Sequence, residues 1–108
     1  MYYTYMIRCV DNSIYTGITT DIERRFREHI EQEGAGAKYT RSHRPLEISA
    51  VWSSKNRSLA SALEYRIKRL SKKQKEELIS KPDYLEKFLG DKVEIGEYSI
   101  VPDCGANV

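Results

Sequence analysis

The chain has 108 residues, of which 40% are hydrophobic, so it is expected to form one domain around one modest core. No apolar stretch approaches transmembrane length, and residues 1–5 lack the basic region and apolar run of a secretory signal. Cys9 and Cys104 are the only cysteines and lack metal-ligand spacing, which indicates a reducing compartment. We therefore expect a cytoplasmic protein with no membrane partner.

Charge is unevenly distributed along the chain. The net charge is +2, but residues 1–75 hold 15 Lys and Arg against 8 Asp and Glu, whereas residues 76–108 hold 3 against 8. A basic body with an acidic tail suits a polyanionic partner such as nucleic acid. A solvated surface with uneven charge explains the same counts, and charge alone favours that plainer interpretation.

The N-terminal segment is typical of a β-hairpin. Residues 2–9 alternate as a strand, and residues 14–19 form the second strand after a turn with the sequence Asp-Asn-Ser. A three-residue turn places Tyr5 opposite Thr19 and on the same face as Tyr15. A two-residue turn would reverse that relation, because a slip of one residue exchanges the faces.

The next segment is typical of an amphipathic helix capped by Thr20 or Asp21. Apolar residues recur every four positions and predict a buried stripe, formed by Ile22, Phe26 and Ile30. A parallel polar stripe lies one residue round the helix and contains Asp21, Arg25 and His29. The segment Gly34-Ala35-Gly36 ends the helix and begins a basic loop that runs to Pro45.

The second half of the chain predicts a third strand, three helices and a tail. The strand covers 46–52, with Leu46, Ile48 and Ala50 on one face; the helices cover 59–70 after a Ser58 cap, the segment from Ser71 to about Ser80, and 83–89. The predicted fold class is α/β, a small, mainly antiparallel three-stranded sheet flanked by helices. Residues 1–90 are expected to form the domain. Residues 91–108 are an acidic C-terminal extension that either adds a strand or lies disordered.

Two short motifs and three later side chains occur in an informative order. The motifs are Tyr3-Thr4-Tyr5 and Tyr15-Thr16-Gly17, and the side chains are Arg25, His29 and Glu64. In this order and spacing the chain resembles the GIY-YIG endonuclease family over roughly its first 80 residues, counting elements of ordinary length. The stretch from Gly36 to Arg41 further resembles the small stand-alone bacterial branch, which is akin to the nuclease module of junction resolvases.

The resemblance implies a metal-dependent DNA endonuclease that hydrolyses phosphodiester bonds in repair or recombination. It makes Tyr15 the candidate base, while Tyr5 positions the water or phosphate, Arg25 stabilises phosphoryl charge and His29 assists. Glu64 would hold one Mg²⁺ or Mn²⁺ ion, and Gly17 is a structural part of the second motif.

Some of these residues have plainer interpretations. Tyr5 and Tyr15 are also ordinary strand aromatics. His29 is a general base, a phosphate donor or a satisfied histidine beside the core. Glu64 sits beside an apolar stripe, so it needs a partner, either a metal ion or a nearby cation, of which Arg66, Lys68 and Lys38 are the candidates.

The basic loop after the first helix is a candidate DNA contact through its phosphate-binding and stacking side chains, Lys38, Tyr39, Arg41 and Arg44. The alternative is a plain surface loop. The expected partners are DNA and a larger repair protein for targeting, and the expected state is a monomer. The first motif lacks the family's glycine and isoleucine. The rival function is therefore a nucleic-acid-binding module that cuts weakly or not at all.

Overall fold

The computed structural model describes residues 1–31 and 42–102. Within them, one antiparallel sheet has four strands in the order β2-β1-β3-β4. The strands are β1 (Tyr2–Cys9), β2 (Ile14–Thr19), β3 (Pro45–Ser54) and the short β4 (Ser99–Ile100). The predicted α/β fold class is confirmed. The fourth strand, β4, lies in the C-terminal extension that begins at residue 91, for which the sequence left both a strand and disorder open.

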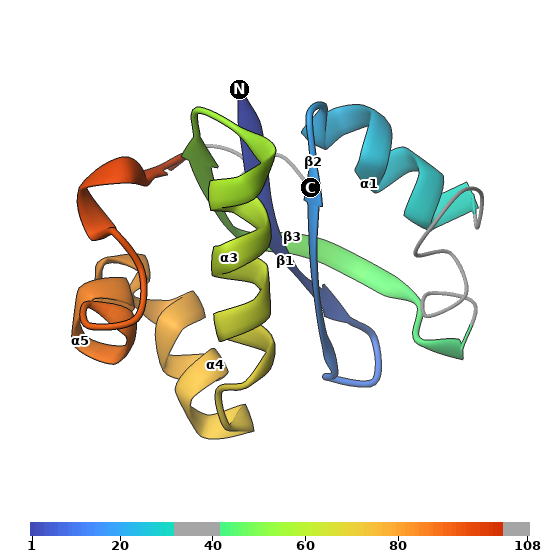
Figure 1. The fold of residues 1–108 in the computed structure, drawn as a ribbon. Helices are drawn as coiled ribbons and strands as arrows, with labels where there is room; N and C mark the ends of the chain where they lie inside the picture. Colours follow the sequence, from blue (N-terminus) through green and yellow to red (C-terminus); the bar gives the residue numbers. More distant parts are fainter. Residues whose placement is uncertain (32–41, 103–108) are drawn as a thin grey trace.

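Helices cover both faces of this sheet (Figure 1). The helices are α1 (Ile22–Glu31), α3 (Arg57–Lys68), α4 (Lys72–Ser80) and α5 (Leu85–Leu89), with 3-10 turns η1 (Pro82–Tyr84) and η2 (Ile95–Glu97). The face of β1 that carries Met6 packs against α3, α4 and α5, whereas the face that carries Tyr5 packs against α1. No helix among the described residues combines the length and apolarity needed to cross a membrane.

The β1–β2 turn is longer than the three residues expected. The Cys9 amide donates to the Ser13 carbonyl over 2.9 Å, and Asn12 adopts a left-handed φ of 69°, a conformation that asparagine tolerates. Tyr5 consequently pairs with Gly17, so the predicted pairing with Thr19 is wrong by two residues. A slip of two preserves the faces, and Tyr5 and Tyr15 therefore still lie on the same side of the sheet.

Helix α1 is rotated relative to the predicted buried stripe. Asp21 caps it, its carboxylate accepting the Arg24 amide over 3.1 Å. Ile30 is 54% exposed, whereas His29 is only 1% exposed. The expectation that Ile30 is buried is wrong, because the helix turns its polar stripe, rather than the end of its apolar stripe, toward the sheet. This rotation brings the candidate site residues together.

Strand β3 contains a bulge that exchanges its faces. Met6 pairs with Ala50 and Ile7 pairs with Ile48, so Ser49 is the extra residue. As a result, Ile48 packs on the α1 side while Ala50 packs on the α3 side. The prediction that Ile48 and Ala50 share a face is wrong for this reason.

The caps of the later helices follow local sequence. Ser71 and Gln74 form the two reciprocal bonds of a capping box at α4. Helix α3 begins two residues earlier than expected, because Asn56 rather than Ser58 caps it by accepting the Leu59 amide over 2.9 Å. The Tyr98 hydroxyl donates to the Leu59 carbonyl over 2.7 Å, which ties the C-terminal segment to α3.

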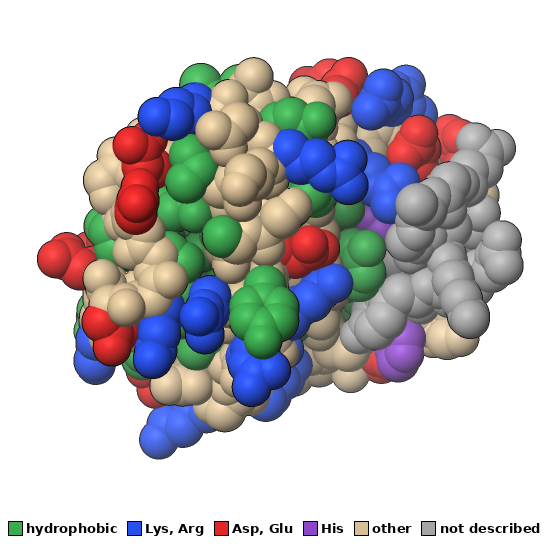
Figure 2. All heavy atoms as spheres, in the orientation of Figure 1, with side chains coloured by type: hydrophobic (Ala, Val, Ile, Leu, Met, Phe, Trp, Pro, Cys, Tyr) green, Lys and Arg blue, Asp and Glu red, His purple; other side chains and the backbone are tan. Residues whose placement is uncertain are grey.

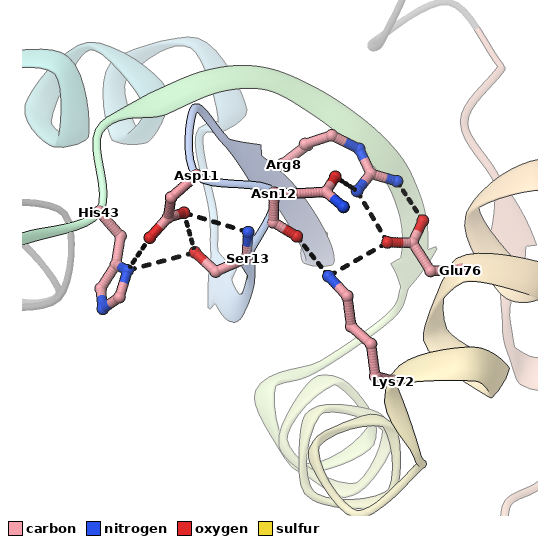
Figure 3. A network of polar contacts seen from close by, with 7 residues as sticks. All are labelled: Arg8, Asp11, Asn12, Ser13, His43, Lys72 and Glu76. Carbon is pink, nitrogen blue, oxygen red and sulfur yellow. Dashed lines mark hydrogen bonds and ion pairs between the residues drawn. The ribbon is translucent and has the colours of Figure 1, made fainter.

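A polar network fixes the β1–β2 turn to its surroundings (Figure 3). The Arg8 guanidinium pairs with the Glu76 carboxylate on α4 and donates to the Asn12 side chain over 2.7 Å. Lys72 pairs with Glu76 over 3.1 Å and donates to the Asn12 carbonyl. On the other side of the turn, Asp11 accepts from His43 over 2.6 Å. The hairpin that carries Tyr5 and Tyr15 is thus held at its far end by α4.

Candidate active site

The central feature of the candidate site is the buried hydroxyl of Tyr5. Tyr5 is 2% exposed, and its Oη lies 2.9 Å from Nε2 of His29 and 3.3 Å from Nε of Arg25. Arginine only donates, so Tyr5 accepts from Arg25 and can donate in turn to His29. Residues of β1 and α1 that lie 20 and 24 positions apart therefore form one hydrogen-bonded chain.

Gly17 allows Tyr5 to reach that position. A Cβ at residue 17 would lie 2.6 Å from Oη of Tyr5 and 3.0 Å from a ring carbon of Tyr15. These distances are shorter than side-chain carbons tolerate, so the missing side chain creates the space that both rings use. The close approach of the two rings thus requires a glycine at this position of the second motif.

Tyr15 completes the aromatic group. Its ring centroid lies 6.2 Å from that of Tyr5 and 5.0 Å from that of His29. Lys68 of α3 approaches from the other side, with Nζ 5.9 Å from the Tyr15 centroid. Tyr15 lies on the edge strand β2, so it is the point where side chains from α1 and α3 meet.

Burial sets the ionisation of the group. Desolvation raises the pKa of Tyr5 well above its usual value, although the Arg25 hydrogen bond opposes the shift. Desolvation, together with the nearby Arg25 charge, lowers the pKa of His29 to about 4. At neutral pH, Tyr5 is therefore a protonated phenol and His29 a neutral imidazole.

Arg25 is held in a fixed orientation. Its side chain is 14% exposed, and Nη1 donates to the Glu28 carboxylate over 2.8 Å while Nε donates to Tyr5. Glu28 was not singled out from the sequence, although its spacing of three residues from Arg25 on a helix predicts an ion pair between the two side chains.

Glu64 reaches the site from the opposite face of the sheet. Thr4 is fully buried, and its hydroxyl donates to the Ala60 carbonyl of α3 over 3.0 Å. That bond docks α3 on β1 one turn before Glu64. The Glu64 side chain is 24% exposed and pairs with Lys68 over 3.3 Å. Its charge contributes to the raised pKa of Tyr5, after burial and the charge of Tyr15.

Comparison with known proteins identifies the family of this arrangement. Residues 1–77 match the model of the GIY-YIG catalytic domain. The chain belongs to the GIY-YIG family. This is a nuclease family, and its substrate class is nucleic acid; the two tyrosine motifs, Arg25 and Glu64 all fall within the matched segment.

Relatives place this GIY-YIG protein in a small bacterial branch, as the sequence predicted. A UPF0213 protein of Fusobacterium nucleatum is 50% identical over 76% of this chain and 80% of its own length. UPF0213 protein YhbQ of Salmonella arizonae is 47% identical over 82% of this chain and 86% of its own. The solution NMR structure of a UPF0213 protein from Bacillus halodurans is 43% identical, covers 74% of this chain and 84% of its own, and has a TM-score of 0.47.

The Glu64 carboxylate of this GIY-YIG protein fits a hard divalent cation. Among the described residues, no three or more His, Cys, Asp or Glu side chains are grouped to hold a metal. Mg²⁺ commonly binds through one or two carboxylates and keeps several waters. Glu64 meets that requirement, because it is partly exposed and its partner Lys68, 51% exposed, can move away.

The predicted DNA-contacting loop of the GIY-YIG protein lies largely outside the described residues, which exclude Lys38, Tyr39 and Arg41. Arg44 is described: its side chain is exposed, and its carbonyl accepts the Val10 amide over 2.7 Å.

From the sequence, Lys68 was named only as a possible partner of Glu64, and its approach to Tyr15 was missed. Thr4 was missed as well, because its partner lies 56 residues away.

Proposed function

We propose that this protein is a divalent-metal-dependent endonuclease that hydrolyses phosphodiester bonds in DNA, in repair or recombination. The observation that carries the proposal is the Tyr5–Arg25–His29 chain beside Tyr15, next to the Glu64–Lys68 pair. Phosphodiester hydrolysis needs an activated water, charge relief on the phosphoryl oxygens and help for the leaving group. The group contains candidates for the first two tasks.

The two tyrosines take different roles. Tyr15 is the candidate base, because it lies at the sheet edge where a water and a phosphate can approach, with Lys68 beside its ring. Tyr5 is buried, and its raised pKa keeps it protonated, so its proposed role is to position Arg25 and His29 through its hydroxyl rather than to act as a base. His29 is neutral and accepts from Tyr5, so its proposed role is to orient that hydroxyl rather than to transfer protons.

The cationic side chains stabilise the phosphoryl group. Arg25 is already oriented by Tyr5 and Glu28, and its remaining N–H donors suit a phosphoryl oxygen. Lys68 can turn from Glu64 to a phosphate because its side chain is 51% exposed. A divalent cation held by Glu64 would supply further charge neutralisation at the phosphate.

The decisive experiment replaces Glu64 with glutamine, which keeps its size and removes its charge. Wild-type protein should cut at least one of a panel of branched, nicked and linear DNAs with Mg²⁺ or Mn²⁺. Glu64→Gln should lower the cleavage rate by about 100-fold or more and weaken Mn²⁺ binding measured by calorimetry, while DNA binding persists. Glu86→Gln removes an equivalent charge from an exposed site on α5 and should leave both properties unchanged.

Tyr15→Phe and Arg25→Lys test the other roles in the same assay. The phenylalanine removes the proton acceptor and should suppress cleavage by about 100-fold or more, whereas the lysine keeps a charge but loses the planar fork. Equal cleavage by wild type and Glu64→Gln would refute the metal assignment. A wild-type protein that binds DNA but cuts nothing on the panel would leave the binding-module function in its place.

A further inference from the structure

Tyr65 on α3 presents its ring to solvent immediately beside Glu64. It is 55% exposed, and among the described residues it is the only aromatic side chain classed as exposed. Leaving so much of an aromatic ring in water forgoes the stabilisation that burial gives. The ring is therefore open to contact with a ligand.

Two guanidinium groups frame the Tyr65 ring. The central carbon of Arg66 lies 5.4 Å and that of Arg69 lies 5.3 Å from the ring centroid, both within cation–π range. These contacts hold the ring in place on the helix surface. They also put two phosphate-binding groups against a ring that is still 55% exposed, so an aromatic side chain and positive charge are available together.

Helix geometry joins this ring to the candidate active site. Glu64 and Lys68 are four residues apart and line one stripe of α3, and Tyr65 and Arg69 line the next stripe round. Figure 2 shows Lys and Arg side chains gathered over α3 and beside it on this face. A strand with a phosphate at the Glu64 stripe would therefore carry its next nucleotide onto the Tyr65 stripe.

We propose that Tyr65, framed by Arg66 and Arg69, is a stacking platform for an unpaired base of the nucleic-acid substrate. This inference rests on the proposed nuclease function and narrows its substrate to strands with an unpaired nucleotide beside the cut phosphate. A base inside a duplex is already stacked on both sides, so its face is not available to a protein ring. Single strands and unpaired ends leave that face open, and stacking on tyrosine tolerates any base.

The test measures binding without divalent metal, so it does not depend on cleavage. The probes are a short fluorescent single-stranded DNA, RNA of the same sequence, the corresponding DNA duplex, and a single strand of abasic sugar-phosphate units. The variants are Tyr65→Leu, which keeps bulk but removes the π face, and Tyr65→Phe, which keeps that face. Tyr84→Leu is the matched control: Lys81 and Lys87 also flank the Tyr84 ring, but Tyr84 directly precedes α5 and does not belong to α3. Circular dichroism checks folding.

Tyr65→Leu should weaken single-strand binding by about 5- to 150-fold, the range expected for one lost base–aromatic stack. Tyr65→Phe should stay within about twofold of wild type, and Tyr65→Leu should bind duplex and abasic strand as wild type does. The DNA and RNA strands show which sugar the platform accepts.

Equal single-strand binding by Tyr65→Leu and wild type would overturn the platform and leave the nuclease proposal standing. An equal loss on the abasic strand, or an equal loss in Tyr84→Leu, would also overturn it, because the effect would then not come from a stacked base at Tyr65. Wild-type protein that binds none of the four probes would refute the proposed function itself.

Discussion

Replacing Gly17 with alanine tests how the site is assembled. The new methyl carbon would lie 2.6 Å from Oη and 2.9 Å from Cζ of Tyr5. Tyr5 is buried under α1 and cannot swing into solvent. The ring must therefore shift, and its hydroxyl must leave His29, now 2.9 Å away, and Arg25, now 3.3 Å away.

The expected cost combines several terms. Forcing a methyl group into a packed core costs about 1–3 kcal/mol, and leaving buried hydrogen-bonding groups unpaired costs about 1–3 kcal/mol. Replacing glycine also reduces the conformational entropy of the unfolded chain, which stabilises the folded protein by about 0.5–1 kcal/mol. We therefore expect Gly17→Ala to lower the free energy of unfolding by about 1–5 kcal/mol, which lowers the melting temperature by roughly 5–25 °C in a domain of this size.

Urea unfolding of five proteins measures this effect: wild type, Gly17→Ala, Gly96→Ala, Tyr5→Phe and the double variant. Gly96→Ala is the control, because nothing lies within 4 Å of its added Cβ, and it should not lower stability. Tyr5→Phe removes the nearest clashing atom, so adding Gly17→Ala to it should cost at least about 1 kcal/mol less than in wild type. An equal cost in both backgrounds, or a Gly17→Ala protein as stable as Gly96→Ala, would refute the close-approach argument.

Two further predictions concern acid stability. Burial, then the Arg25 charge, lower the pKa of His29 from 6.5 to about 4, so the unfolded chain takes up a proton before the folded one. The stabilisation that depends on neutral His29 is therefore fully present above pH 6.5, and the free energy of unfolding should fall by about 3 kcal/mol toward pH 4. Urea unfolding across this pH window measures the fall, and His29→Gln should remove it. The hydrogen bonds from Arg8 lower the pKa of Glu76 from 4.5 to about 2, so its stabilisation is present above pH 4.5 and is lost toward pH 2. The Glu76 side chain is 34% exposed, and solvent screening limits its contribution to about 1 kcal/mol. Glu76→Gln should remove this second loss in acid-titration melts, and an unchanged acid limb would contradict the Arg8–Glu76 argument.

Local patterns predicted the later helices well. The capping box of Ser71 and Gln74 lies within four residues, so its hydrogen bonds can be read without knowledge of the rest of the chain. The hairpin register was harder, because Asn12 adopts a left-handed conformation that lengthens the turn. The face shared by Tyr5 and Tyr15 was still correct, since strand periodicity is two and the error was two.

The bulge at Ser49 was not visible in the sequence. Leu46, Ile48 and Ala50 alternate as a regular strand would, yet pairing with β1 inserts an extra residue and sends Ile48 and Ala50 to opposite faces. Bulges arise from how two strands accommodate each other and their layers. A pattern within one strand carries no record of that accommodation.

By itself, the sequence determined which elements form and which polar side chains lie in step along them. Helix periodicity put Arg25 with His29, because that relation depends only on neighbours in one element. The face shared by Tyr5 and Tyr15 also depended on the hairpin register, and it was correct because the error in that register was an even number of residues. Only the tertiary structure decided that α1 buries His29 and exposes Ile30. It also decided that α3 brings Lys68 from the other face of the sheet to Tyr15. Both outcomes depend on contacts between residues far apart in the chain, where burial against a specific partner outweighs any local pattern.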